Sequence, residues 1–161
     1  METGIMERLT DLLFEKIVGN LVKLLGGALV LTILLQILAR YAMNHPFSWT
    51  EEFSRLVFIW FCMLSSTITL KRKLHIGIDF VYNKLSLRSR KRVEIIIHLF
   101  IFVFGLLLLY YGSKLLLTTI DQKTEILRWP SAVYFSSVPL VGMFYCLLSS
   151  VEILKQVKRT V

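Results

Sequence analysis

The charged residues that could bind another group are concentrated in one short stretch of this sequence. Glu51, Glu52 and Arg55 lie within five residues of one another. On a helix, the Arg55 guanidinium would come about one turn after each carboxylate and could pair with either. Such a cluster offers ionic chemistry: an ion pair that simply ends a helix, or a polar site for a partner chain or a charged solute. Both interpretations stay open from the residues alone.

The residues in front of this cluster predict the start of a helix. Ser48 precedes Glu51 by three residues, which is the spacing of a capping box, where the hydroxyl accepts a backbone N–H and the carboxylate reaches back to the cap. Acidic side chains in a first turn also interact favourably with the helix dipole. Asn44 and Pro46 predict a short turn just before this start, so the preceding helix should be an antiparallel neighbour.

Histidine and cysteine positions give no indication of a cofactor or metal site. A haem between helices needs imidazoles that face each other, whereas His45 lies near the turn, His75 in a basic segment and His98 in an apolar block. Cys62 and Cys146 each lie inside an apolar block, where we expect buried small residues rather than a disulfide. We therefore expect no metal, no cofactor and no enzyme activity.

The apolar residues that surround this chemistry form four blocks. Hydrophobic residues make up 55% of the chain and the mean hydropathy is +0.65. The uncharged blocks are 24–39, 56–70, 95–113 and 129–151. A bilayer core of about 30 Å needs about 20 helical residues, and fewer when terminal Lys or Arg side chains reach the headgroups. The sequence therefore predicts an all-α membrane protein, a single four-helix transmembrane domain over residues 1–161, with helices at approximately 17–41, 49–70, 93–117 and 131–155.

The basic residues predict the orientation of these helices. With a cytoplasmic N-terminus, 14 of the 19 Lys and Arg residues would lie inside and 5 outside, so both termini should be cytoplasmic. The net charge of +8 then describes an inner membrane face, and no nucleic acid is expected as a partner. Between helices 2 and 3 we expect a cytoplasmic amphipathic segment whose basic cluster faces anionic lipid: Lys84, Arg88, Arg90, Lys91 and Arg92.

Small residues and a proline bear on how the helices pack. Gly26 and Gly27 would let another backbone approach closely. Pro139 leaves two alternatives for the last helix. A helix that begins near Ser131 must kink at this proline, whereas a helix that begins at Ser137 places it in the first turn, where it is tolerated.

The stretch from Arg40 to Asp79 also resembles a known family. Its pattern is Arg40-Tyr41, Asn44, Pro46, Trp49-Thr50-Glu51-Glu52, Arg55 and Trp60, followed by His75-Ile76-Gly77-Ile78-Asp79. This pattern is similar to that of the small permease subunit, DctQ type, of tripartite ATP-independent periplasmic (TRAP) transporters. The resemblance covers nearly the whole chain, and its most specific part is the Arg-Tyr to Trp-x-Glu-Glu-x-x-Arg spacing. Ser65-Ser66 departs from the Gly-Ala type of pair expected in many members.

The resemblance implies a non-catalytic subunit of a larger machine in the bacterial inner membrane. A DctM-type large permease, expected at one to one, would carry the substrate and sodium sites and move by an elevator motion, which the small subunit braces. A periplasmic binding protein would deliver an organic anion such as sialic acid or a C4-dicarboxylate. Residues with an interface or structural role would be Arg40, Asn44, Pro46, Trp49, Glu51, Glu52, Arg55, Trp60, His75 and Asp79.

Two other classes of function remain as alternatives. An independent small four-helix transporter or channel would carry a solute alone in proteoliposomes. A membrane anchor subunit of a redox enzyme would show cofactor absorbance and a catalytic partner. Neither class is favoured, because the apolar blocks hold no acid and no facing pair of imidazoles.

Overall fold

The computed structural model describes residues 10, 12–45, 47–72 and 87–158. Its elements are a π-helical segment, η1 (Leu12–Val18), the helices α2 (Gly19–Tyr41), α3 (Ser48–Lys71) and α5 (Leu87–Thr119), the short α6 (Ala132–Phe135) and α7 (Ser137–Lys158). Four helical stretches are long and apolar enough to cross a membrane: Leu12–Tyr41, Ser48–Lys71, Arg92–Thr119 and Ala132–Gln156. For the described residues, the prediction of an all-helical fold with four such helices is confirmed.

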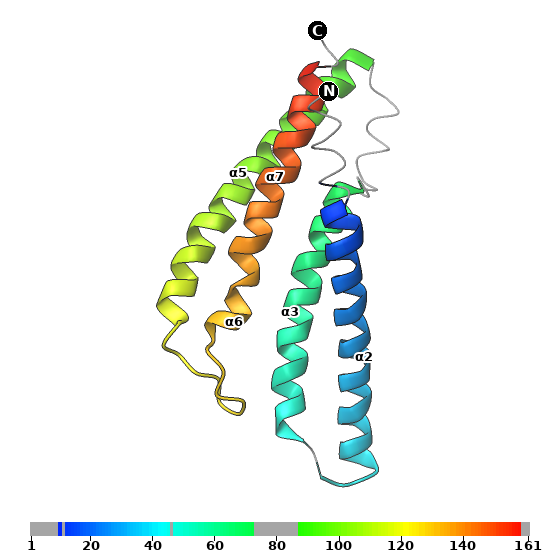
Figure 1. Cartoon of the computed structure of the whole chain (residues 1–161), viewed down its shortest axis with the longest axis vertical. Coiled ribbons are helices and arrows are strands. Elements are labelled where there is room, and N and C mark those ends of the chain that lie inside the picture. Colours follow the sequence, from blue (N-terminus) through cyan, green and yellow to red (C-terminus); the bar gives the residue numbers. More distant parts are fainter. Residues whose placement is uncertain (1–9, 11, 46, 73–86, 159–161) are drawn as a thin grey trace.

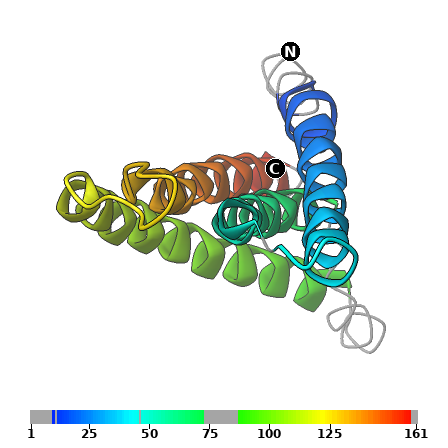
Figure 2. The ribbon, with the colours of Figure 1, turned by 90° about the horizontal axis from the view of Figure 1, so that it is seen from below.

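The helices form two antiparallel hairpins that meet along α3 and α7 (Figure 1). One hairpin is α2 with α3 and the other is α5 with α7, which share the most extensive contact in the described chain. Viewed along the bundle, α3 lies between α2 and the second hairpin (Figure 2). The turn at 42–45, which follows α2, and the loop at 120–131 lie at one end, here named the loop end, and the described chain ends lie toward the other (Figure 1).

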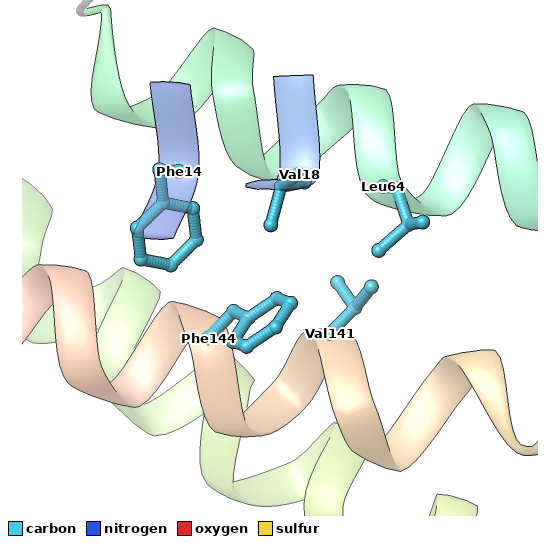
Figure 3. Close-up of a cluster of buried hydrophobic side chains, with 5 residues drawn as sticks. All are labelled: Phe14, Val18, Leu64, Val141 and Phe144. Carbon is cyan, nitrogen blue, oxygen red and sulfur yellow. The ribbon is translucent and has the colours of Figure 1, made fainter. Parts of the chain in front are cut away.

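A small apolar core joins the two hairpins. Phe14 and Val18 of η1, Leu64 of α3, and Val141 and Phe144 of α7 converge there, and each is at most 9% exposed (Figure 3). The Phe14 and Phe144 rings meet edge to face at 5.0 Å, a geometry that aromatic quadrupoles favour. The segment η1 is thereby held against the last helix.

The α5/α7 hairpin depends on glycines that let two backbones touch. A Cβ atom added to Gly142 would stand 2.7 Å from the Leu109 nitrogen and 2.8 Å from the Gly105 oxygen. One added to Gly112 would stand 2.9 Å from the Pro139 nitrogen. In a membrane, close contact of this kind supplies the dispersion energy that holds helices together, because lipid is as apolar as the side chains.

The last span follows one of the two alternatives left open by the sequence. Ser136 separates α6 from α7, its N–H bonding to the Ala132 oxygen at 2.9 Å. Because α7 begins at Ser137, Pro139 lies in its first turn, where the missing N–H has no intrahelical partner to lose. The proline therefore breaks no hydrogen bond inside the helix.

Within the described residues, Gly26 and Gly27 do not meet another backbone. A Cβ added to Gly26 would meet the ring of Phe61, and one added to Gly27 would meet no atom within 4 Å, whereas close backbone contacts occur at Gly105, Gly112 and Gly142. That another chain approaches Gly26 and Gly27 stays a prediction. Cys62 is exposed rather than buried, because its side of α3 is not covered by another helix, and Cys146 is half-buried. Both cysteines are free.

Several predicted residues lie outside the described part of the chain. These are Pro46, His75, Asp79 and Lys84, together with the side chains of Arg88, Arg90 and Lys91. The expected amphipathic segment between the second and third spans is among them, and its cytoplasmic position stays a prediction. Arg92 is exposed on α5, which begins at Leu87, several residues before the predicted 93.

Candidate functional site

The polar residues picked out by the sequence meet at the loop end, where α3 begins. Asn44 turns the chain there in the left-handed region (φ 50°), which asparagine tolerates better than most residues. Phe47 is the N-cap of α3 and no side chain caps the helix. Thr50 Oγ donates instead to the Phe47 oxygen at 2.6 Å. The predicted capping box is wrong because the Glu51 side chain extends forward to Arg55 and does not reach back.

Glu52 is the central residue of this end. It is only 9% exposed, and its Oε2 accepts the backbone N–H groups of Ile126 and Leu127, each at 3.0 Å. A carboxylate that accepts two backbone amides makes strong, charge-assisted hydrogen bonds. Arg55 and the Thr124 side chain also stabilise its charge, although Oε1 has no hydrogen-bond partner among the described residues.

The loop that Glu52 binds has a hairpin-like form of its own. The Thr124 N–H donates to the Trp129 oxygen at 2.8 Å, and the Ser131 N–H to the Gln122 oxygen at 2.7 Å. Arg128 adopts a positive φ of 56° at its tip, a conformation that costs free energy in a residue other than glycine. We name residues 120–131 the docked loop, because Glu52 holds its tip against α3.

Two further hydrogen bonds tie α3 to the start of the last span. The Tyr134 hydroxyl donates to the Glu52 backbone oxygen at 2.9 Å, and Trp60 Nε1 donates to the Val133 oxygen at 3.0 Å. Tyr134 is 7% exposed, so its hydroxyl needs this partner. Glu52 and Trp60 thus have a structural role within the chain, joining residues more than 70 positions apart.

The ion pair at this end is different, because it faces solvent. Arg55 Nη2 lies 3.4 Å from Glu51 Oε1, with side chains 67% and 71% exposed. Exposed pairs of this kind contribute about 0–1 kcal/mol. The sequence left Glu51 and Glu52 as possible partners of Arg55. In the structure Arg55 pairs with Glu51, whereas Glu52 accepts its hydrogen bonds from the docked loop.

The other predicted residues of the loop end are exposed side chains. Arg40, at the end of α2, is exposed, as is Asn44 in the turn. Trp49 is 43% exposed, and its ring lies 6.4 Å from that of Phe53. Within the described residues, no group of three or more His, Cys, Asp and Glu side chains could hold a metal ion.

Sequence reasoning missed Tyr134 and the docked loop. The loop sequence between the third and fourth spans mixes charges, and nothing in its composition indicates that two of its amides bind a carboxylate on α3. Trp129-Pro130 marks its return to the helix, with Pro130 paired to Lys123 in an isolated β-bridge. That local signal does not identify the bonding partner.

Comparisons with known proteins place this geometry in context. Residues 29–159 match the DctQ component of tripartite ATP-independent periplasmic transporters. The chain is 31% identical over 103 residues to the sialic acid TRAP transporter permease protein SiaT of Haemophilus influenzae, covering 62% of this chain and 17% of that protein.

Two relatives from Vibrio cholerae serotype O1 are small permease proteins. The sialic acid TRAP transporter small permease protein SiaQ is 33% identical over 82 residues, covering 48% of this chain and 47% of that protein. The C4-dicarboxylate TRAP transporter small permease protein DctQ is 29% identical over 83 residues, covering 52% and 36%. The chain thus matches less than half the length of each of the three relatives.

Proposed function

Because this chain belongs to the DctQ component family of TRAP transporters and is a multi-pass membrane protein, we propose that it is the small, non-catalytic subunit of a sodium-coupled importer of organic anions. The large permease subunit would carry the substrate and sodium sites, and a periplasmic binding protein would deliver the anion. The small subunit would brace the immobile part of an elevator-type permease. The observation that carries this proposal is the family match over residues 29–159.

The substrate class rests on the names of the relatives. Two are sialic acid transporter proteins and one is a C4-dicarboxylate transporter protein, so a carboxylate is the common feature. The similar segment makes up only 17% of the Haemophilus permease protein. A segment of this kind within a much longer permease supports the proposal that this chain acts beside a larger one.

The exposed faces of the chain favour a partner along α2 and α5. Only 6% of the most apolar 18-residue stretch is buried in each of the first and third spans, against 28% in the second and fourth. A bracing subunit needs a rigid body with open apolar faces, and the α5/α7 contact and the core at Phe14 supply the rigidity. Lipid would cover whichever face the large subunit leaves free.

Orientation and location belong to the same proposal. The chain would lie in the bacterial inner membrane with its N-terminus on the cytoplasmic side. The loop end would then lie on the periplasmic side, where a binding protein could reach it. The distribution of basic residues, 14 inside against 5 outside, supports this orientation. The basic cluster that ends at Arg92 would then face the anionic inner leaflet.

The polar residues at the loop end divide into two groups in this proposal. Glu52 and Trp60 bind the chain's own backbone and would act on a partner only by positioning the docked loop. Trp49, Glu51 and Arg55 have exposed side chains and could contact the large subunit directly.

The test is a mild-detergent purification of the tagged chain from its native membrane, followed by reconstitution. We expect a large polytopic partner at one to one, and sodium-dependent carboxylate uptake only when both chains and the binding protein are present. A chain that purifies alone, or that carries a solute by itself in proteoliposomes, would overturn the proposal and favour an independent small transporter.

A further inference from the structure

A pocket with a volume of 490 Å³ opens at the loop end between α3 and the docked loop. Its charged lining comes from both sides: Glu51, Glu52 and Arg55 from α3, and Lys123 and Glu125 from the docked loop. All of these except Glu52 are exposed residues. The Arg55–Glu51 pair is itself exposed to solvent, so a ligand can reach both of its charges. The hydrogen bonds from Ile126 and Leu127 to Glu52 fix the separation of the two walls.

The pocket changes from charged to apolar along the direction of α3. Glu51, Arg55 and Ile59 are spaced by four residues and so lie above one another on one helix face, about 6 Å apart per step. Ile59, one turn beyond Arg55 on α3, and Phe135, the last residue of α6, contribute apolar lining. A ligand that fills the pocket therefore needs a charged end and an apolar end.

The pocket also lies at the level expected for lipid headgroups. Trp49 and Trp129 are 43% and 40% exposed at the loop end, and Tyr110 and Tyr111 are 66% and 62% exposed on the half of α5 that leads to the docked loop. Exposed Trp and Tyr side chains of transmembrane helices gather at the boundary between headgroups and acyl chains. At the headgroup level of a membrane, the abundant molecule with both a charged end and an apolar end is a phospholipid.

The balance of charge selects the kind of headgroup. Three carboxylates, those of Glu51, Glu52 and Glu125, line the pocket with two cations, Arg55 and Lys123. A purely anionic headgroup would pair with the two cations, but the three carboxylates would repel it. A headgroup that carries an ammonium group as well as a phosphate complements both signs.

We propose that this pocket binds a zwitterionic phospholipid with a primary ammonium headgroup. The phosphate contacts Arg55 and Lys123, the ammonium group faces Glu51 and Glu125, and an acyl chain follows Ile59 and Phe135 toward the bundle centre. The bound lipid bridges α3 and the docked loop and so reinforces the hydrogen bonds of Glu52. This binding rests on the pocket and on its level in the membrane, and it does not depend on the proposed transport function.

Native mass spectrometry of the full chain, purified with any large subunit it retains, tests the proposal. Delipidated protein is titrated separately with phosphatidylethanolamine, phosphatidylglycerol and inorganic phosphate. We expect phosphatidylethanolamine to be retained most strongly, and inorganic phosphate not to displace it at equal concentration. Losing one charged contact should weaken binding about fivefold to tenfold. Arg55→Gln should therefore weaken both phospholipids, and Glu125→Gln should remove the preference for phosphatidylethanolamine over phosphatidylglycerol.

Lys114→Gln is the matched control, since Lys114 is an exposed cation of α5 outside this pocket, and it should leave both affinities unchanged. Equal retention of the two phospholipids by the wild type, or equal loss in the Lys114→Gln and Arg55→Gln variants, would overturn the proposal. Displacement by inorganic phosphate would assign the pocket to a free anion. Crosslinking of a Glu125→Cys variant to the large subunit, with no lipid retained, would assign it to a protein partner.

Discussion

Replacing Gly142 by alanine should open the α5/α7 hairpin, because the added methyl group meets backbone rather than flexible side chains. Its Cβ would stand 2.7 Å from the Leu109 nitrogen and 2.8 Å from the Gly105 oxygen. Neither atom can rotate away, since both belong to the regular backbone of α5. The two helices must move apart by about 0.7 Å before the shorter contact becomes an ordinary van der Waals contact, and a gap of that size forfeits a quarter to a half of the neighbouring dispersion energy.

The net effect is the difference of two opposing contributions. Overpacking costs about 1–3 kcal/mol, and clashes with backbone belong to the upper part of that range. Alanine also favours a helix over glycine by about 1 kcal/mol. We therefore expect Gly142→Ala to lower the free energy of unfolding by about 1–2 kcal/mol.

Gly27→Ala is the matched control for this variant. Gly27 is also a helical glycine, but a Cβ added there meets no atom within 4 Å, so its replacement should be neutral or stabilise by up to about 1 kcal/mol. Unfolding of the full chain by titration with SDS, followed by circular dichroism, measures the difference. The reasoning fails if both variants unfold at the same SDS fraction. A Gly105→Ala, Gly142→Ala double variant should lose less than the two single losses combined, because the first methyl group already separates the helices.

Three further predictions concern the loop end. Glu52→Ala should speed amide hydrogen exchange in the tip of the docked loop, because two N–H groups lose their acceptor; Glu51→Ala should not, and equal exchange in the two variants would contradict the assignment of Glu52. Trp60→Phe removes one hydrogen bond to a backbone oxygen and should destabilise by about 1 kcal/mol in the SDS titration; an unchanged unfolding curve would show that the bond contributes nothing. Arg55→Ala should cost at most about 1 kcal/mol of stability, since its ion pair is exposed, yet it should weaken co-purification with the large subunit. Full assembly and full uptake by this variant would argue against a role for Arg55 at the interface.

The four spans could be predicted from the sequence because membrane insertion is decided locally. Any stretch of sufficient apolar length meets the requirement, whatever it packs against. The turn at Asn44 was also predictable, since asparagine adopts a left-handed conformation more readily than most residues. The start of the last span was not, because Pro139 is compatible with both a kinked helix and a first-turn position. In the structure α7 begins at Ser137, and Pro139 lies against Gly112 of α5, a contact that the local sequence does not encode.

The site was predicted less completely, for a different physical reason. Glu51 and Glu52 are adjacent and chemically identical, so the sequence gives no reason to prefer one of them as partner of Arg55. The two side chains leave α3 in different directions. The Glu51 side chain is 71% exposed, whereas Glu52 is 9% exposed because the docked loop covers it. The acceptor and its two donors are more than 70 residues apart, and no local pattern encodes such a contact.

Three hydroxyl groups of α3 are satisfied within their own helix. Ser66, Thr67 and Thr69 donate to the oxygens of Met63, Leu64 and Ser65. A hydroxyl satisfied three or four residues back has little to offer another chain. The apolar faces of α2 and α5 can hold a partner but discriminate poorly between protein and lipid, since both present hydrocarbon. The exposed charges beside the docked loop, those of Glu51, Arg55, Lys123 and Glu125, offer the directional contacts that these apolar faces lack, to the large subunit or to a phospholipid.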